Sequence, residues 1–431
     1  MSLNSELLQG PDLTNNLVGI LLRFRQDPVA VMGDVQSMFQ QVRVPVEDRD
    51  FLRFLWWSGG DLAKGLEEYR MTVHLFGAVS SSSCVNFAMR RNAEDHQHEF
   101  SPEVVSTVLK NFYVDDCLKP LPSSHEAIKH VCDLRNLMNK GSFNLTKWVS
   151  NDRLVLESIP VEDRAKGTKE LDLTCDALPV ERALGVSWFV EADQFGFKVF
   201  VKDRPCTRRG ILPAVSSLYD PLGMAAPFIL PAKLLLQDLG RRGLGWDNGA
   251  PDLHLTRWRA WVDDLPKISR IAIERCVKPV KSSDIASCQI HHFCDASQVA
   301  YGSVSYLRLV DMQGRIFCSF LIGKSRLAPL KKITTPRLEL TAATVSVQLN
   351  KILTKELKIP IDELTFWTDS MTVIRYIANE SKSFYTYVAN SVAFIREESS
   401  PSQWRYIDGK SNPADEASRG VTADVFVCNG R

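Results

Sequence analysis

Four acidic residues in the C-terminal third of the chain stand at positions that suggest chemistry. Asp295 ends an apolar run in FCDAS, Glu339 lies in the first turn of an expected helix in PRLEL, and Asp369 ends a second apolar run in FWTDS. Asp415 opens an expected helix in NPADEASRG. Carboxylates held close together repel one another unless a cation lies between them, and their oxygens suit Mg²⁺ or Mn²⁺. A single Asp after a strand is usually a cap or turn residue, but four acids in this order favour a metal site.

The alternation of apolar and polar residues predicts the elements that position these acids. The expected strands are Gln289–Cys294, Tyr301–Val310, Arg315–Ile322, Leu364–Thr368 and Gln403–Ile407, with a hairpin turn at Asp311–Gly314. The expected helices are Met371–Ala378, Tyr385–Arg396 and a longer one that Thr335 caps, with Pro336 in its first position and an apolar stripe of Leu338, Ala342, Val345, Leu349 and Ile352. Three strands followed by helix, strand, helices and strand predict a mixed five-stranded sheet covered by helices.

The order and sequence contexts of the four acids closely resemble retroelement ribonuclease H over about residues 288–420. The stretches KSRLAPLKKITTPRLEL and NPADEASRG resemble the BEL/Pao branch of LTR retrotransposons. The resemblance implies that Asp295, Glu339, Asp369 and Asp415 are ligands of two Mg²⁺ or Mn²⁺ ions, with Asp295 bridging both. Such a site would hydrolyse the RNA strand of an RNA–DNA hybrid. Many ribonucleases H carry a mobile His before the last Asp, whereas this chain has no His after His292, so we expect slower cleavage.

Basic residues precede Glu339 and suit contacts with the phosphates of a hybrid duplex. They are equally compatible with a solvated loop. The residues concerned are Lys324, Arg326, Lys331, Lys332 and Arg337.

A second group of acids lies in the N-terminal half. NFYVDD, preceded by Val108 and Leu109, is typical of a strand that ends in Asp115 and Asp116, and a tight hairpin at Tyr113–Asp116 would let both carboxylates reach one metal. Upstream, PVAVMGDVQSMFQQV predicts an apolar strand that ends at Asp34.

This arrangement resembles a reverse transcriptase, in which Asp34, Asp115 and Asp116 would hold two metal ions. By that resemblance Phe39, five positions after Asp34, would exclude the 2′-hydroxyl of ribonucleotides. Further family resemblances imply contacts with the RNA template, the DNA primer or the dNTP. Gly77 and Ser81 would lie in the template and nucleotide loop, and Lys147 near the triphosphate. Leu184 and Gly185 would form a hairpin at the primer end. Lys147 could equally be a solvated surface residue, and ERALGVSW a plain buried hairpin.

The expected fold is therefore α/β (α+β) in three parts. We predict a reverse transcriptase palm with partial fingers over residues 1–203, a thumb or connection over 204–280, and a ribonuclease H-like domain over 285–431. The segment Lys278–Ser287 is polar, contains Pro279 and suits a linker.

The composition fits an intracellular globular protein. The 431 residues are 45% hydrophobic and 24% charged, with a net charge of +1, so binding to nucleic acid depends on local patches. Ten cysteines without a CxxC pair argue against zinc or a disulfide framework. A polar N-terminus and the absence of a long apolar run predict no signal peptide and no membrane segment. Together with the resemblance, they imply a location in the cytoplasm or a retroelement particle.

Taken together, the sequence predicts a BEL/Pao-type polyprotein fragment with reverse transcriptase and ribonuclease H, without the protease and integrase. Only 33 residues precede Asp34, where the family usually has about a hundred residues of fingers. Metal ligands bind substrate poorly without a phosphate clamp, so we expect hybrid cleavage to be retained more than DNA synthesis. The alternative is a non-catalytic nucleic-acid-binding remnant of a retroelement.

Overall fold

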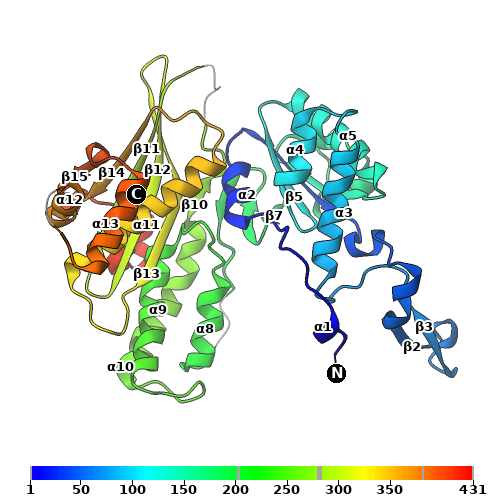
Figure 1. The fold of residues 1–431 in the computed structure, drawn as a ribbon, viewed down its shortest axis with the longest axis horizontal. Helices are drawn as coiled ribbons and strands as arrows, with labels where there is room; N and C mark the ends of the chain where they lie inside the picture. The colour runs from blue at the N-terminus through cyan, green and yellow to red at the C-terminus, as the bar shows by residue number, and fades with distance from the viewer. Residues whose placement is uncertain (1, 201–203, 279–283, 381–382, 430–431) are drawn as a thin grey trace. The chain divides into compact units, whose positions relative to one another are not determined.

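The computed structural model describes residues 2–200, 204–278, 284–380 and 383–429. It divides into two compact units, Met1–Pro179 and Val180–Arg431 (Figure 1). The predicted boundary at 203 and most of the predicted linker, residues 279–283, lie outside the described residues. The three-part domain scheme therefore stays a prediction.

The first unit is built on a four-stranded sheet in the order β4-β5-β1-β6. The strands are β1 (Val29–Val35), β4 (Phe112–Tyr113), β5 (Asp116–Leu121) and β6 (Leu145–Ser150). The helices of this unit are α1 (Leu3–Glu6), α2 (Leu17–Phe24), α3 (Ser81–Asp95), α4 (Pro102–Lys110), α5 (Ser124–Lys140), α6 (Arg153–Glu157) and α7 (Lys166–Lys169). Val108 and Leu109 belong to α4, so the expectation that they begin a strand is wrong. Their Ser101 cap and Pro102 start a helix that runs to Lys110.

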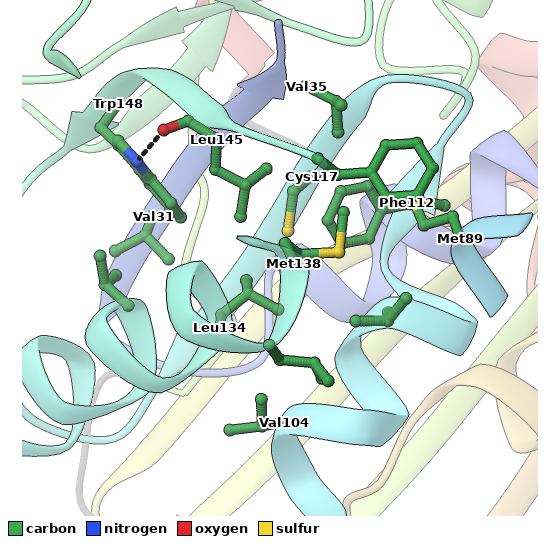
Figure 2. Close-up of a cluster of buried hydrophobic side chains, with 14 of the residues drawn as sticks. Val31, Val35, Met89, Val104, Phe112, Cys117, Leu134, Met138, Leu145 and Trp148 are labelled. Atoms are coloured by element: carbon green, nitrogen blue, oxygen red, sulfur yellow. Dashed lines mark hydrogen bonds between the residues drawn. The ribbon is translucent and has the colours of Figure 1, made fainter. Parts of the chain in front are cut away.

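Apolar side chains from β1, β5 and the helices fill the core of this sheet (Figure 2). Six of the seven residues of β1 are buried, which explains its nearly continuous apolar sequence. Trp148 of β6 is fully buried and its Nε1 donates a hydrogen bond to the Leu145 carbonyl oxygen over 3.2 Å (Figure 2). A Cβ built on Gly33 would lie 3.0 Å from the Trp148 ring, so only glycine lets β1 pass this close to the indole.

A separate hairpin in the first unit consists of β2 (Arg53–Trp57) and β3 (Leu66–Arg70). Its apolar side chains, among them Leu55 and Trp56, are largely exposed.

The second unit contains two sheets. The smaller has the order β10-β9-β8-β7, formed by β7 (Val180–Ala183), β8 (Val186–Phe189), β9 (Gln194–Gly196) and β10 (Ala272–Glu274). Helices α8 (Arg208–Ser217), α9 (Ala226–Arg241) and α10 (Asp252–Asp264) lie between β9 and β10 in the chain. The Gly323 amide donates to the Leu222 carbonyl oxygen over 2.7 Å, which ties the segment before α9 to the larger sheet.

The larger sheet has five strands in the order β13-β12-β11-β14-β15. They are β11 (Ile285–Ala296), β12 (Ala300–Asp311), β13 (Ile316–Leu327), β14 (Glu363–Thr368) and β15 (Trp404–Tyr406). The pairs β11–β12 and β12–β13 are antiparallel, whereas β14 is parallel to β11 and to β15. The prediction of a mixed five-stranded sheet is thus confirmed. The helices are α11 (Thr335–Glu356), α12 (Met371–Ala378), α13 (Thr386–Glu398), α14 (Ala414–Arg419) and α15 (Ala423–Asn429), and α11 packs on β11 and β12 (Figure 1).

Several predicted boundaries need correction. Strands β11 and β13 are longer than expected. Along most of β11 partly exposed and buried positions alternate, and in β13 the additional residues alternate exposed with partly exposed positions, which fits a half-covered sheet. The cap of α11 is Thr334, with Thr335 in the first helical turn, since the preceding Thr already has the extended backbone that a cap requires. The expected turn is present: Asp311 Oδ1 accepts hydrogen bonds from the Gln313 and Arg315 amides, over 3.0 and 2.8 Å.

No helix among the described residues is both long and apolar enough to cross a membrane.

Candidate active sites

The acids of the first unit come together at one end of its sheet. Asp34 of β1 is the register partner of Asp116 of β5, and the Val35 amide donates to the Asp115 carbonyl oxygen over 2.9 Å. The hairpin between β4 and β5 turns at Val114, whose φ of 55° lies in the left-handed region. The predicted tight hairpin is therefore present, and the pairing of β1 with β5 brings Asp34 to the same end of the sheet as Asp115 and Asp116.

The charges of these carboxylates affect one another's ionisation. Burial, then the charges of Asp115 and Asp34, raise the pKa of Asp116 to about 6. Burial also raises the pKa of Asp115, with a further rise from Asp34. The charge that opposes this repulsion is Lys147, whose Nζ lies 3.0 Å from Asp34 Oδ1. Lys147 has a φ of 53°, so the chain of β6 holds it in a strained conformation next to the acids.

The remaining predicted contacts of the first unit surround the loop before α3. Phe39 meets the exposed Phe76 edge to face, with ring centroids 5.9 Å apart. Gly77 has a φ of 94° and open space where a Cβ would point, and its carbonyl oxygen accepts a hydrogen bond from Asn4 over 2.9 Å. Ser81 is buried at the start of α3. Leu184 and Gly185 belong to the second unit, where they form the tip of the β7–β8 hairpin with φ values of 47° and 89°.

The acids of the second unit are brought together by the parallel pairing of β11 and β14. Cys294 and Thr368 are register partners, so the residues that follow them, Asp295 and Asp369, lie side by side. The pKa of Asp369 is raised to about 7, mainly by burial. The charge of Asp295, a hydrogen bond with Asp295 and the charge of Glu339 contribute smaller increases. A carboxyl group this close to two others is protonated or needs a nearby cation.

Two serines that the sequence analysis did not single out hold these acids. Ser370 Oγ donates a hydrogen bond of 2.5 Å to Glu339 Oε2, and Ser418 Oγ donates one to Asp295 Oδ2. The fourth acid, Asp415 of α14, forms an ion pair of 2.5 Å with Arg419 one turn later. Gly409 also borders the site, because a Cβ there would lie 3.2 Å from Asp369 Oδ2. Ser370 directly follows Asp369 in TDS, but Ser418 has no acidic neighbour in ASR, and serine is too common for either to be a distinctive signal.

The predicted phosphate contacts lie on two elements of the second unit, β13 and α11. Lys324 and Arg326 are two residues apart on β13 and so share one face of it. Burial lowers the pKa of Lys324, and the charge of Arg326 lowers it further. The Arg337 guanidinium lies over the Tyr387 ring, 5.6 Å from its centroid.

Hard carboxylate oxygens in this number suit Mg²⁺ or Mn²⁺. Burial is the main cause of the raised pKa values of Asp116 and Asp369, and a cation would relieve the repulsion that adds to it. The side chains are nevertheless not arranged as a finished cage. Within the part of the chain that the structure describes, no group of three or more His, Cys, Asp or Glu side chains could hold a metal ion as it stands. Asp34 and Asp415 are instead paired with Lys147 and Arg419, and both would have to turn to reach an ion.

Comparison with solved structures defines the class of fold. The chain resembles a foamy viral protease-reverse transcriptase in complex with an RNA/DNA hybrid, with a TM-score of 0.53 and 12% identity over 93% of this chain and 46% of that one. It also resembles the dRH form of that protein in complex with double-stranded DNA, with a TM-score of 0.53 and 13% identity over 94% and 61%. The chain thus has a mixed α/β fold similar to that of retroviral reverse transcriptase and ribonuclease H, and spans about half to three fifths of these structures.

The particular family follows from the sequence. Residues 207–370 match the family described as Pao retrotransposon-like RNaseH-like domain. This segment belongs to that family, which confirms the predicted relationship to BEL/Pao retrotransposons. The match runs through α8, α9 and α10 as well as β11 to β14, so it includes Asp295, Glu339 and Asp369, and it ends at residue 370 without reaching Asp415. No protein of curated function matches the chain.

Proposed function

We propose that this chain is a fragment of a retroelement polyprotein that cleaves the RNA strand of RNA–DNA hybrids. The observation that carries the proposal is the pairing of β11 with β14, which sets Asp295 beside Asp369. Glu339 is near enough for its charge to raise the pKa of Asp369 further. Acids so placed at the ends of adjoining strands suit divalent-cation chemistry better than a structural role, because their mutual repulsion costs stability.

In the proposed site Asp295, Glu339, Asp369 and Asp415 would hold two Mg²⁺ or Mn²⁺ ions. When bound, such ions supply the activation of a water and the neutralisation of a leaving 3′ oxygen. The chain's own contribution is orientation: Ser418 holds one oxygen of Asp295, and Ser370 holds one oxygen of Glu339. The basic side chains of Lys324, Arg326 and Arg337 would bind the phosphates of the hybrid.

For the N-terminal part we propose a polymerase ancestry, with a palm and partial fingers over 1–203 and a thumb or connection over 204–280. Asp34, Asp115 and Asp116 would hold two ions of the same kind. Phe39, Gly77, Ser81, Lys147, Leu184 and Gly185 would contact the template, the primer or the dNTP. DNA synthesis would require the Asp34–Lys147 ion pair to open, so we expect less of it than of hybrid cleavage.

A specific observation favours a second candidate, a remnant that binds nucleic acid without catalysis. Asp34 and Asp415 each form an ion pair with a cation of the chain, Lys147 and Arg419. A cation of the chain that takes the place of a metal ion neutralises the cluster but cannot activate a water. In this case the hybrid would be bound and not cut.

The test is cleavage of a labelled RNA–DNA hybrid by the full chain in Mg²⁺ or Mn²⁺, with Asp369→Asn as the inactive variant. Asp252→Asn is the matched control, because Asp252 is an exposed acid at the start of α10 outside both sites. The proposal predicts cleavage by the wild type and the control, a loss of at least about 100-fold in Asp369→Asn, and no cut in the DNA strand.

Metal binding provides a second readout that does not depend on activity. Mn²⁺ should raise the unfolding temperature of the wild type and of Asp252→Asn, and should do so much less in Asp369→Asn. Binding of the hybrid without cleavage, together with no Mn²⁺ stabilisation, would establish the non-catalytic remnant instead.

A further inference from the structure

A cavity of about 950 Å³ lies within the second unit and includes none of the seven acids. Its walls come from α9, α10, the loop that precedes α11, and the residues that follow α14. Hydrogen bonds tie these walls together: Gln237 Nε2 donates to the Ala328 carbonyl oxygen over 2.8 Å, and the Val421 amide donates to the Pro227 carbonyl oxygen over 3.2 Å. A preformed cavity of this size is large enough for a small-molecule ligand.

One wall of the cavity is a stack of three aromatic rings. Phe228 and Trp261 have ring centroids 5.2 Å apart at 20°, and Trp261 and Trp258 have centroids 5.4 Å apart at 17°. Trp261 Nε1 donates to the Phe228 carbonyl oxygen over 2.9 Å, which fixes the position of the stack. All three rings are almost completely buried. Because the rings cover one another, they form a rigid apolar wall, which favours an apolar group on the ligand.

His254 adds a buried polar atom to the cavity lining. The side chain is only 2% exposed, and its Nε2 lies 2.6 Å from Asp238 Oδ2. An ionised carboxylate can only accept a hydrogen bond, so Nε2 carries the proton and donates it. The other ring nitrogen, Nδ1, is buried without a hydrogen-bond partner.

The mouth of the cavity carries excess positive charge. Arg257 and Lys332 line it, are exposed, and have no acidic partner among the described residues. Two acids also line it, but each is already compensated. Asp264 pairs with Lys267 and accepts from the Ala423 amide, and Asp238 is shared by His254, Arg241 and Arg242. The uncompensated cations favour an anionic group on the ligand.

We propose that this cavity binds a small molecule that combines a flat aromatic ring with an anionic group. The ring lies in the cavity beside the wall that the three stacked aromatic side chains support, and the anion lies at Arg257 and Lys332. Two sources share this chemistry, a nucleoside monophosphate and a non-nucleotide aromatic acid. The site is separate from the proposed hydrolytic function and does not depend on it.

The test uses 8-anilinonaphthalene-1-sulfonate as the aromatic anion and N-phenyl-1-naphthylamine as its neutral counterpart, with the fluorescence of each probe titrated against the folded full chain. Leu234→Trp fills the cavity, and Leu253→Trp is its control, because Leu253 is 59% exposed on α10 and does not line the cavity. Arg257→Gln removes a cation from the mouth, and Arg259→Gln removes one from the same helix outside this cavity.

We expect Leu234→Trp to weaken binding of both probes by about tenfold or more, and Arg257→Gln to weaken only the sulfonate, by about fivefold. The controls should bind as the wild type does. Unchanged binding in Leu234→Trp, or an equal loss of both probes in Arg257→Gln, would overturn the proposal. Displacement of the bound sulfonate by dAMP would support a nucleotide as the ligand, and displacement by naphthalene-2-sulfonate alone would support an aromatic acid.

Discussion

Gly33, the residue before Asp34, offers a test of how tightly the first site is built into its core. In Gly33→Ala the new Cβ would lie 3.0 to 3.2 Å from three atoms of the Trp148 ring. Trp148 has no space to retreat, since it is fully buried and bonded to Leu145. Overpacking of this kind costs about 1–3 kcal/mol, while the lower entropy of the unfolded alanine chain returns about 0.4–1 kcal/mol. We therefore expect the free energy of unfolding to fall by about 1–2 kcal/mol.

The measurement is urea unfolding of the full chain. Unfolding is monitored by hydrogen exchange in peptides from β1 and α5, because these peptides report on the first unit alone. Gly65→Ala is the control, because a Cβ at Gly65 meets nothing within 4 Å and its backbone is not left-handed. It should be neutral or slightly stabilising. Adding Trp148→Phe to Gly33→Ala should cost less than the sum of the two single changes, because the smaller ring relieves the contact. Equal stability of Gly33→Ala and the control would refute the packing argument.

Two further predictions concern the second unit. Burial raises the pKa of Asp220 to about 6, although its carboxylate accepts hydrogen bonds from the Met224 and Ala225 amides. This folded pKa lies above the unfolded value of about 3.9. The contribution of Asp220 to stability is therefore complete below about pH 4 and is lost as the pH rises through about 6. The total loss in the free energy of unfolding is on the order of 3 kcal/mol. Asp220→Asn should flatten the stability of the second unit between pH 4 and pH 7 by that amount, as measured by urea unfolding, and an unchanged pH profile would contradict the assignment. Arg419→Gln releases Asp415 from its ion pair and should tighten Mn²⁺ binding by up to about fivefold, because such exposed pairs are worth about 1 kcal/mol at most. The Mn²⁺ affinity is measured by isothermal titration calorimetry, with Arg405→Gln as the control because Arg405 lies outside the site. Weaker Mn²⁺ binding in Arg419→Gln would show that the arginine supports the site.

The approach of the acids could be predicted from sequence because it depends on strand ends. Asp295 and Asp369 each follow an apolar run, and neighbouring parallel strands bring such positions to the same edge. The Asp34–Asp116 pairing likewise follows from one strand and one hairpin. The position of each acid at the end of its strand is a local pattern that a period of two and a turn specify.

The partners of these acids could not be predicted, because they depend on where separate elements meet. Ser418 reaches Asp295 across 123 residues of sequence, and the pairing of Lys147 with Asp34 depends on an unusual backbone angle in β6. The strand expected at Val108 and Leu109 failed for a related reason. Valine and leucine fit a strand or a helix, and the Ser101–Pro102 start of α4 decides between them.

The central claim is that the acids of the second unit gather around divalent ions. Crystals of the full chain grown with Mn²⁺ and measured at the manganese absorption edge would test it most directly. The proposal predicts anomalous peaks that contact Asp295 and Asp369, with Glu339 and Asp415 turned toward them and Asp415 released from Arg419. Crystals saturated with Mn²⁺ that show no peak at these carboxylates, with the Asp415–Arg419 pair intact, would contradict it.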